Sequence, residues 1–136
     1  MSALLKSASV YAITMFSDDL DRSKSFYRHV FGLPVYFEDQ NSAVFQLDNV
    51  LINLLAFPAA PKLIKPGTVA SRKAGARYVL TIGVDDVDAV CAELARRRVT
   101  LLNGPMDRPW GIRTASFTDP GGHIWEIAQQ LPRTGD

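Results

Sequence analysis

An internal repeat constrains the fold of this chain more than any other feature of its sequence. The segment AITMFSDDLDRS, which begins at Ala12, aligns without a gap with VLTIGVDDVDAV, which begins at Val79. The alignment places Asp19 on Asp86, and the same order of expected elements surrounds both copies. Similar segments at a fixed spacing are typical of repeated structural units. The sequence therefore predicts two copies of one supersecondary module.

Each copy predicts a strand, a helix and three further strands. Strand formers, capping aspartates and apolar stripes at helical spacing support these predictions. The first copy is expected to have a strand at 10–16, a helix within 17–32 and strands near 34–38, 43–47 and 50–56. The second is expected to have a strand from Val79, a helix at about 86–97 and strands near 99–103, 112–118 and 123–129. Short polar turns favour antiparallel neighbours.

The length of 136 residues suits one compact domain, here residues 1–136. Its expected parts are module one at about 8–57, a linker at about 58–77 and module two at about 78–131. The linker contains three prolines and two glycines and has neither helical nor strand periodicity. We expect it to run over the surface.

Charge and hydrophobicity exclude several kinds of partner. Lys and Arg total 15 and Asp and Glu total 14, so the net charge of +1 gives no strong field to attract nucleic acid. The densest basic run, 96–98, falls at the end of the second expected helix, where it offsets the helix dipole. The apolar run VLINLLAF is far shorter than the ~20 residues that span a bilayer. We expect neither a nucleic-acid partner nor a membrane segment.

The single cysteine and the N-terminal segment both indicate the cytoplasm. Cys91 cannot form an internal disulfide, which suits a reducing compartment. Its neighbours at helical spacing are apolar, so we expect a buried, unreactive thiol with a raised pKa. The segment MSALLKSASV has too few successive apolar residues for a signal peptide. The expected localisation is cytoplasmic.

Two long motifs show a resemblance to a known superfamily. SDDLDRSKSFYRHVFGLPV in the first half and PWGIRTASFTDPGGHIWEI in the second resemble patterns of the vicinal oxygen chelate superfamily. That superfamily includes glyoxalase I, extradiol dioxygenases, and fosfomycin- and bleomycin-resistance proteins. The resemblance covers nearly the whole chain. It implies an α+β fold in which two βαβββ modules form curved mixed sheets around a cleft, often completed in a homodimer.

The resemblance also assigns metal ligands to the first and last strands of each module. Those four positions hold Ala12, Asn53, Val79 and Glu126 in this chain. Only Glu126 is a conventional ligand, whereas catalytic metal sites normally have at least three protein ligands. His123 does not add one, because residues three apart on a strand point to opposite faces. We therefore expect no metal and no other cofactor.

Glu126 then has two possible roles. An unpaired carboxylate in an apolar cleft is costly and tends to stay protonated. As structural polar filling, Glu126 would be partly hydrated or would meet Arg113 or Arg108. As a functional group, it would bind a basic or hydroxylated part of a ligand, or act as a general acid or base.

Strand alternation predicts which side chains accompany Glu126 in the cleft. Bulky residues on the opposite faces, including Tyr11, Met15 and Tyr78, should lie under the helices. In the loop NGPMDRPWGIR, Trp110 can stack on a planar ligand or only cap the core or a dimer contact, and Arg113 can bind a carboxylate or phosphate. The expected ligand-binding residues, unless they merely fill the interior, are Thr14, Phe16, Asn53, Leu55, Phe57, Thr81, Trp110, Arg113 and Glu126.

The missing metal donors favour a binding protein over an enzyme. The resulting hypothesis is a homodimer, similar to the bleomycin-resistance branch, that holds a small amphipathic or aromatic molecule in a metal-free cleft for sequestration or resistance. The alternative is an enzyme of the same superfamily, a lyase, isomerase or dioxygenase. Such an enzyme would use an atypical metal site or acid–base chemistry at Glu126.

Overall fold

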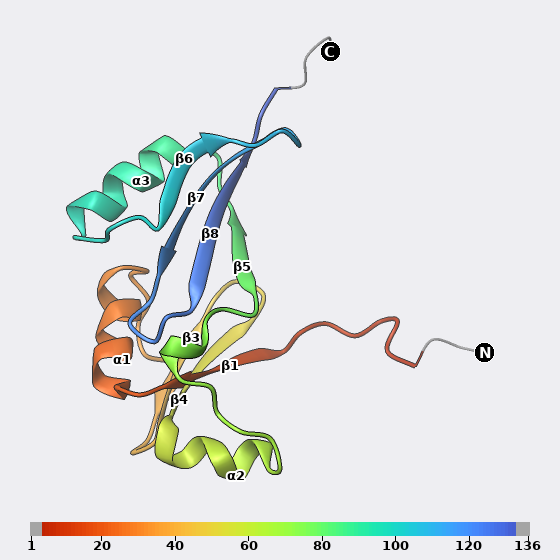
Figure 1. The fold of residues 1–136 in the computed structure, drawn as a ribbon, viewed down its shortest axis with the longest axis vertical. Coiled ribbons are helices and arrows are strands. Elements are labelled where there is room, and N and C mark those ends of the chain that lie inside the picture. The colour runs from red at the N-terminus through yellow and green to blue at the C-terminus, as the bar shows by residue number, and fades with distance from the viewer. Residues whose placement is uncertain (1–3, 133–136) are drawn as a thin grey trace.

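The computed structural model describes residues 4–132 and contains two four-stranded mixed sheets, one from each half of the chain (Figure 1). The first sheet has the strand order β1-β4-β3-β2, and the second has the order β5-β8-β7-β6. In both sheets the first strand is parallel to the last, and the other neighbours are antiparallel. This arrangement confirms the predicted α+β fold of paired βαβββ modules.

The elements occur in the same order in both modules. Module one contains β1 (Ala12–Ser17), α1 (Leu20–His29), β2 (Phe37–Glu38), β3 (Ser42–Gln46) and β4 (Leu51–Ala56). Module two contains β5 (Val79–Gly83), α3 (Val87–Arg96), β6 (Asn103–Asp107), β7 (Ile112–Thr118) and β8 (Ile124–Gln130). Between them lie the short helices η1 (Phe57–Ala59), α2 (Ala60–Ile64) and η2 (Arg72–Ala74). None of the helices within 4–132 has the length and apolar character needed to cross a membrane.

The two long helices begin in the same way. The Asp19 side chain accepts a hydrogen bond from the backbone N–H of Arg22, and the Asp86 side chain accepts one from the backbone N–H of Ala89. Each aspartate thereby satisfies one of the free N–H groups of the first helical turn. The repeat seen in the sequence therefore extends to the local contacts that start each helix.

The helix-facing sides of the two sheets share one apolar core. Strand alternation is plain on β1, where Met15 is fully buried while Thr14 is only partly buried. Phe26 and Phe31, at α1 and just beyond it, pack against Phe117 of the other module, with ring centroids 6.3 and 6.1 Å apart. In Figure 1, α1 and α3 lie along one side of the molecule. The opposite faces of both sheets are not covered by these two helices.

Tyr11 and Tyr78 correct the predicted burial of the bulky strand residues. Tyr11 is 80% exposed and Tyr78 is 47% exposed, although both were expected under the helices. Each immediately precedes its strand, beyond the part of the sheet that the helix covers. Met15, which lies four residues after Tyr11 and within β1, is fully buried as predicted. Strand alternation therefore predicted burial correctly within the strands, but not for the residues that immediately precede them.

The strand β6 was predicted in the wrong place. It was expected near 99–103, and the residues that form it were assigned mainly to a loop. In the structure, Asn103 pairs with Ser116 and Met106 pairs with Thr114, with a shift of register between the two pairs. The shift falls at the Gly-Pro dipeptide within the strand, and that dipeptide reads as a turn when only local sequence is considered.

The linker is also more ordered than its sequence indicates. Pro58 and Pro61 lie in the first turns of η1 and α2, where the missing proline N–H is not needed. Ala60 is completely buried. The linker therefore packs onto the body of the molecule at this point, although it lacks the periodicity of a long helix.

Candidate functional site

Two threonine-centred pairs occupy equivalent positions on the helix-free faces of the sheets. In module one, Asn53 pairs with Thr14 across β4 and β1, and its Nδ2 donates to Thr14 Oγ1 over 3.3 Å. In module two, Glu126 pairs with Thr81 across β8 and β5, and Thr81 Oγ1 donates to Glu126 Oε1 over 3.0 Å. The repeat thus places a neutral amide in one module where the other has a carboxylate.

A cavity of about 340 Å³ lies where β1, the linker and the turn before β8 meet. Thr14 and Phe16 from β1 and Phe57, the first residue of η1 directly after β4, form one wall. The structure therefore brings together three of the predicted ligand-binding residues. The other predicted residues of the sheet faces, Asn53, Leu55, Thr81 and Glu126, are not among the residues that line this cavity.

The second wall comes from the linker and was not predicted. Arg72 and Arg77 line it together with small and hydroxylated residues, namely Thr68, Ala70, Ser71, Gly75 and Ala76. The linker sequence was interpreted as a surface excursion because it has no periodicity. Two arginines set among small residues were the local sign of a binding role, but nothing in the sequence placed them beside β1.

His123 closes the cavity from the turn before β8. Its Nε2 lies 3.1 Å from the Phe16 carbonyl oxygen, and its Nδ1 lies 3.4 Å from the Tyr78 hydroxyl. The Nε2–H tautomer satisfies both contacts, because it donates to the carbonyl and accepts from the phenol. Burial, together with the negative charge of Asp119, raises the pKa of Tyr78. Tyr78 is therefore held in the phenol form that donates this hydrogen bond. His123 lies just before β8, and its side chain contacts Phe16 and Tyr78.

Asp119 fixes this turn against module one. It is 4% exposed, accepts from the Tyr27 hydroxyl over 2.6 Å and accepts from the backbone N–H of His123 over 2.9 Å. Trp125 Nε1 donates in turn to the Tyr27 hydroxyl over 3.0 Å. Burial, followed by the charge of Asp119, raises the pKa of Tyr27, so its hydroxyl stays protonated as the donor. The cavity wall that carries His123 is therefore built on a satisfied, buried network.

The sequence model of the Glyoxalase/Bleomycin resistance protein/Dioxygenase superfamily matches residues 10–127. The chain belongs to this superfamily. The match covers both modules and the linker, and it confirms the resemblance found in the two sequence motifs.

The similar proteins include one whose name states an activity and one whose name states none. The chain is 28% identical over 123 residues to the uncharacterized protein YraH of Bacillus subtilis, covering 88% of this chain and 96% of YraH. It is 25% identical over 109 residues to the metallothiol transferase FosB of Lysinibacillus sphaericus, covering 80% of this chain and 73% of FosB. A crystal structure of a glyoxalase/bleomycin resistance protein/dioxygenase from Nocardioides has a TM-score of 0.83 at 20% identity, covering 94% of this chain and 88% of that one. This last similarity shows the fold alone.

The residues at the superfamily's ligand positions do not fit a divalent metal ion. The side chains of Ala12 and Val79 have no donor atom, and those of Asn53 and Glu126 contact Thr14 and Thr81. Within the described residues, no group of three His, Cys, Asp or Glu side chains is placed to hold a metal. One amide and one carboxylate fall short of the usual three or more protein ligands.

Trp110 and Arg113 are not brought together with the cavity. Trp110 is 68% exposed in the turn between β6 and β7, with the Arg108 guanidinium 5.9 Å from its ring centroid. Arg113 forms ion pairs with Asp88 at 3.0 Å and Asp107 at 2.9 Å. Trp110, which lies outside the core, does not cap it.

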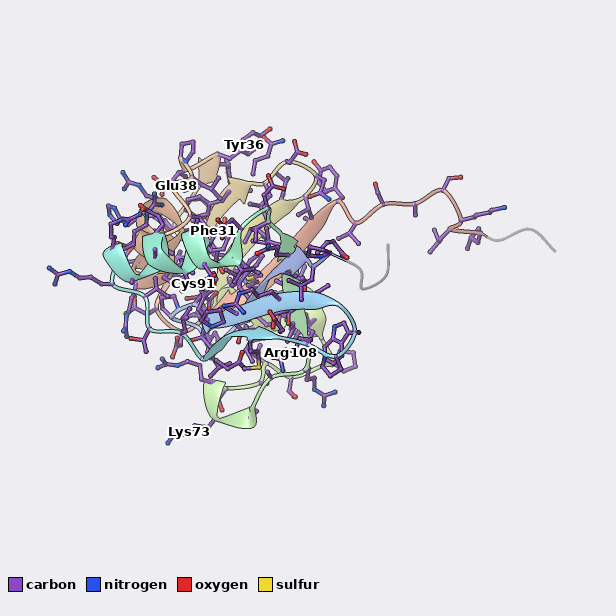
Figure 2. The ribbon with its side chains drawn as sticks, turned by 90° about the horizontal axis from the view of Figure 1, so that it is seen from above. Phe31, Tyr36, Glu38, Lys73, Cys91 and Arg108 are labelled. Carbon is purple, nitrogen blue, oxygen red and sulfur yellow. The ribbon has the colours of Figure 1, made fainter. Side chains whose placement is uncertain are left out.

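The suggested pairing of Glu126 with an arginine is not found within residues 4–132. Arg113 is engaged by two aspartates, and Arg108 donates from Nε to Thr114 Oγ1 over 2.9 Å. Arg108 is labelled in Figure 2. The Glu126 carboxylate instead accepts a hydrogen bond from the Thr81 hydroxyl.

Cys91 has the raised pKa and the apolar neighbours that were predicted, but it is only partly buried. It lies on α3, is partly buried and packs against the apolar core. Burial, followed by the charge of Asp88, raises the pKa of its thiol. A raised pKa lowers the thiolate fraction at neutral pH, which does not suit a nucleophile.

Proposed function

We propose that this protein binds a small amphipathic or aromatic molecule in the cavity beside β1 without using a metal. The observation that carries the proposal is the cavity itself, which joins predicted cleft residues of module one to the linker and to the turn before β8. Its volume of about 340 Å³ falls at the lower end of typical small-molecule sites. Sequestration of a ligand at such a site requires no catalytic group.

The chemistry of the cavity supports an amphipathic ligand. Phe16, Phe57 and Ile124 provide an apolar surface, while the hydroxyls of Thr14 and Tyr78 provide hydrogen-bonding groups. A mostly apolar site with a few polar groups is the usual composition of a small-molecule pocket. The non-donor residues Ala12 and Val79 support binding without a metal.

A ligand screen after metal removal tests this proposal. The protein is treated with a chelator, dialysed and titrated by calorimetry with a panel of aromatic and amphipathic compounds. We expect saturable binding at one ligand per chain, and we expect the Ala70→Trp variant, which places a large side chain on the cavity wall, to bind at least tenfold more weakly. Elemental analysis of untreated protein is the control. Near-stoichiometric Zn, Ni, Mn or Fe that is required for binding would contradict the metal-free proposal.

An enzymatic role has one specific observation in its favour. The Glu126 carboxylate is only partly buried on the helix-free face and is oriented by the Thr81 hydroxyl, as a general acid or base needs to be. If a compound that binds is also converted, we expect Glu126→Gln to abolish turnover while leaving binding in place. Turnover unaffected by this substitution would remove the acid–base role.

We also propose that the protein acts as a homodimer. The N-terminal segment extends away from the body of the molecule (Figure 1) and carries exposed Leu4, Leu5, Val10 and Tyr11 side chains. Exposed apolar side chains grouped on one segment favour burial against another molecule, and the helix-free face of a second copy offers such a surface. Light scattering after size-exclusion chromatography should give twice the chain mass of 15.0 kDa. A monomer at all concentrations would contradict this proposal, whereas a dimer weakened by Leu5→Ser and Tyr11→Ser would support it.

A further inference from the structure

The charged groups that face the cavity are of one sign. Arg72 and Arg77 line it, and no Asp or Glu is among its lining residues within 4–132. The whole protein is nearly neutral, with a net charge of +1. The positive character of the cavity is therefore a local feature and not a consequence of overall composition.

The guanidinium of Arg72 is engaged in contacts that hold the linker in place. Its Nη2 lies 3.1 Å from Asp18 Oδ2, and its Nη1 donates to the Pro120 carbonyl oxygen over 3.1 Å. Its side chain also packs against Gly122, where an added Cβ would lie 3.3 Å from Arg72 Cγ. Asp18 compensates much of the charge of Arg72. Arg72 thus joins the linker to both modules and forms the rim of the cavity.

Arg77 differs from Arg72 because its charge is not compensated in this way. No ion pair joins Arg77 to a carboxylate within residues 4–132. It lies directly before Tyr78, whose hydroxyl reaches His123, so its backbone is next to an ordered part of the wall. A guanidinium carries several N–H donors in a planar fork that matches a carboxylate or a phosphate.

The rest of the cavity complements a charged group with an apolar surface. Phe16 on β1, Phe57 at the start of η1 and Ile124 on β8 line the cavity, and Arg77 lines it from the linker. A ligand in the cavity therefore has aromatic and aliphatic side chains as well as a guanidinium among its neighbours. A purely apolar ligand would leave the arginine without a partner, and a cation would be repelled by it.

We infer that the ligand of this cavity is an amphipathic anion, an apolar body with a carboxylate or phosphate, and that Arg77 selects it. The inference rests on the proposed function, because it names the chemical class of the molecule bound at the same site. The linker, not the repeated modules, then provides the specificity-determining residue.

Four probes with the same naphthalene ring test this selectivity. They are 2-naphthoate, 2-naphthyl phosphate, 2-naphthylmethanol and 2-naphthylmethylamine, titrated into the full chain by calorimetry at low salt. We expect one or both anions to bind at least about tenfold more tightly than the alcohol, as one charge-assisted contact provides, and the amine to bind more weakly than the alcohol. Because the arginine is accessible to solvent, the preference should shrink as the salt concentration rises.

Arg77→Gln and Lys73→Gln form a matched pair of variants. Both remove one positive charge from the linker, but Lys73 is not a lining residue, and Figure 2 shows its side chain at the edge of the molecule, directed away from the body. We expect Arg77→Gln to remove the preference for the anions and leave the alcohol within about twofold, and Lys73→Gln to change neither. Arg77→Lys should restore part of the preference, because it returns the charge without the fork.

The outcomes separate this inference from the proposed function. Equal binding of the anions and the alcohol, or an anion preference that survives Arg77→Gln, overturns the role of Arg77 while leaving a small-molecule site in place. Equal losses in Arg77→Gln and Lys73→Gln show a general charge effect and also overturn it. No binding of any probe, in a protein whose circular dichroism spectrum shows it folded, counts against both proposals. Selective loss of the anions in Arg77→Gln supports the inference.

Discussion

The two modules repeat the same elements, but their helices carry different side chains at an important buried position. Tyr27 of α1 aligns with Leu94 of α3 in the ungapped repeat, and both side chains are buried. Leu94 contributes apolar contacts to the common core, whereas the hydroxyl of Tyr27 reaches Asp119 in the other module. The difference teaches that duplication provides the two halves of the frame, and that a polar side chain present in only one copy joins them.

A second difference lies on the helix-free faces. Module one has the neutral pair of Asn53 and Thr14, and module two has the charged pair of Glu126 and Thr81. Only the neutral pair contributes a residue, Thr14, to the wall of the cavity. Both modules therefore line the proposed binding site, but only module one does so with its threonine-centred pair, and the Glu126 carboxylate of module two lies outside the lining.

Making the two helices alike at Tyr27 should have the largest effect. Tyr27→Leu copies the module-two residue into module one, removes the aromatic packing and leaves the buried Asp119 carboxylate without this donor. We expect a loss of about 3–5 kcal/mol in the free energy of unfolding, measured in urea. Tyr27→Phe, which removes only the hydroxyl, should cost about 1–3 kcal/mol.

The matched control for this comparison is Leu94→Met, a change of similar volume in the other module. It should cost less than about 1.5 kcal/mol. If Tyr27→Phe were no more costly than Leu94→Met, the hydroxyl contact between the modules would not be what distinguishes the two helices.

Removing the helix caps should have a smaller effect, equal in the two modules. Asp19→Ala and Asp86→Ala each delete a side chain that accepts from a backbone N–H of the first turn. Each should cost about 1 kcal/mol in the free energy of unfolding. The double variant should show nearly additive losses, because the two caps share no partner. Markedly unequal losses would show that the repeat does not extend to the energetics of its helices.

Exchanging the charge of the threonine-centred pairs should have the smallest effect on stability. Asn53→Asp makes module one resemble module two, and Glu126→Gln makes the reverse change. Both sites are partly exposed, and a threonine hydroxyl can donate or accept, so we expect unfolding to change by less than about 1 kcal/mol in each case. Ligand affinity is the sharper measurement, because the new carboxylate beside Thr14 should weaken binding of an anion while Glu126→Gln should not.

The strongest local signals in the sequence predicted most of the fold. The capping aspartates, the alternation on β1 and β5 and the repeated order of elements depend on residues close together in the chain, and the structure confirms them. The strand β6 was misplaced because its Gly104–Pro105 dipeptide has the local character of a turn, while its pairing depends on β7. The position of β6 is therefore determined by its pairing with β7 and not by the local preference of its sequence for a turn.

The candidate site was less predictable because its walls depend on distant contacts. Alternation selected Thr14 and Phe16, which line the cavity, but it carried no information on the linker. The position of the linker depends on Arg72, which contacts Asp18 in one module and Pro120 in the other. Neither contact leaves a periodic trace in the sequence, so Arg77 could not be placed beside the cavity before the structure was known.

The linker wall has a consequence for how such a protein can change over evolutionary time. The repeated modules carry the core and the buried contacts of Tyr27, whereas the residues around Arg77 are exposed and outside both modules. Substitutions there can alter the charge and size of the cavity with little loss of folding free energy. Ligand preference can therefore diverge among homologous chains through this short segment, while the duplicated frame stays constant.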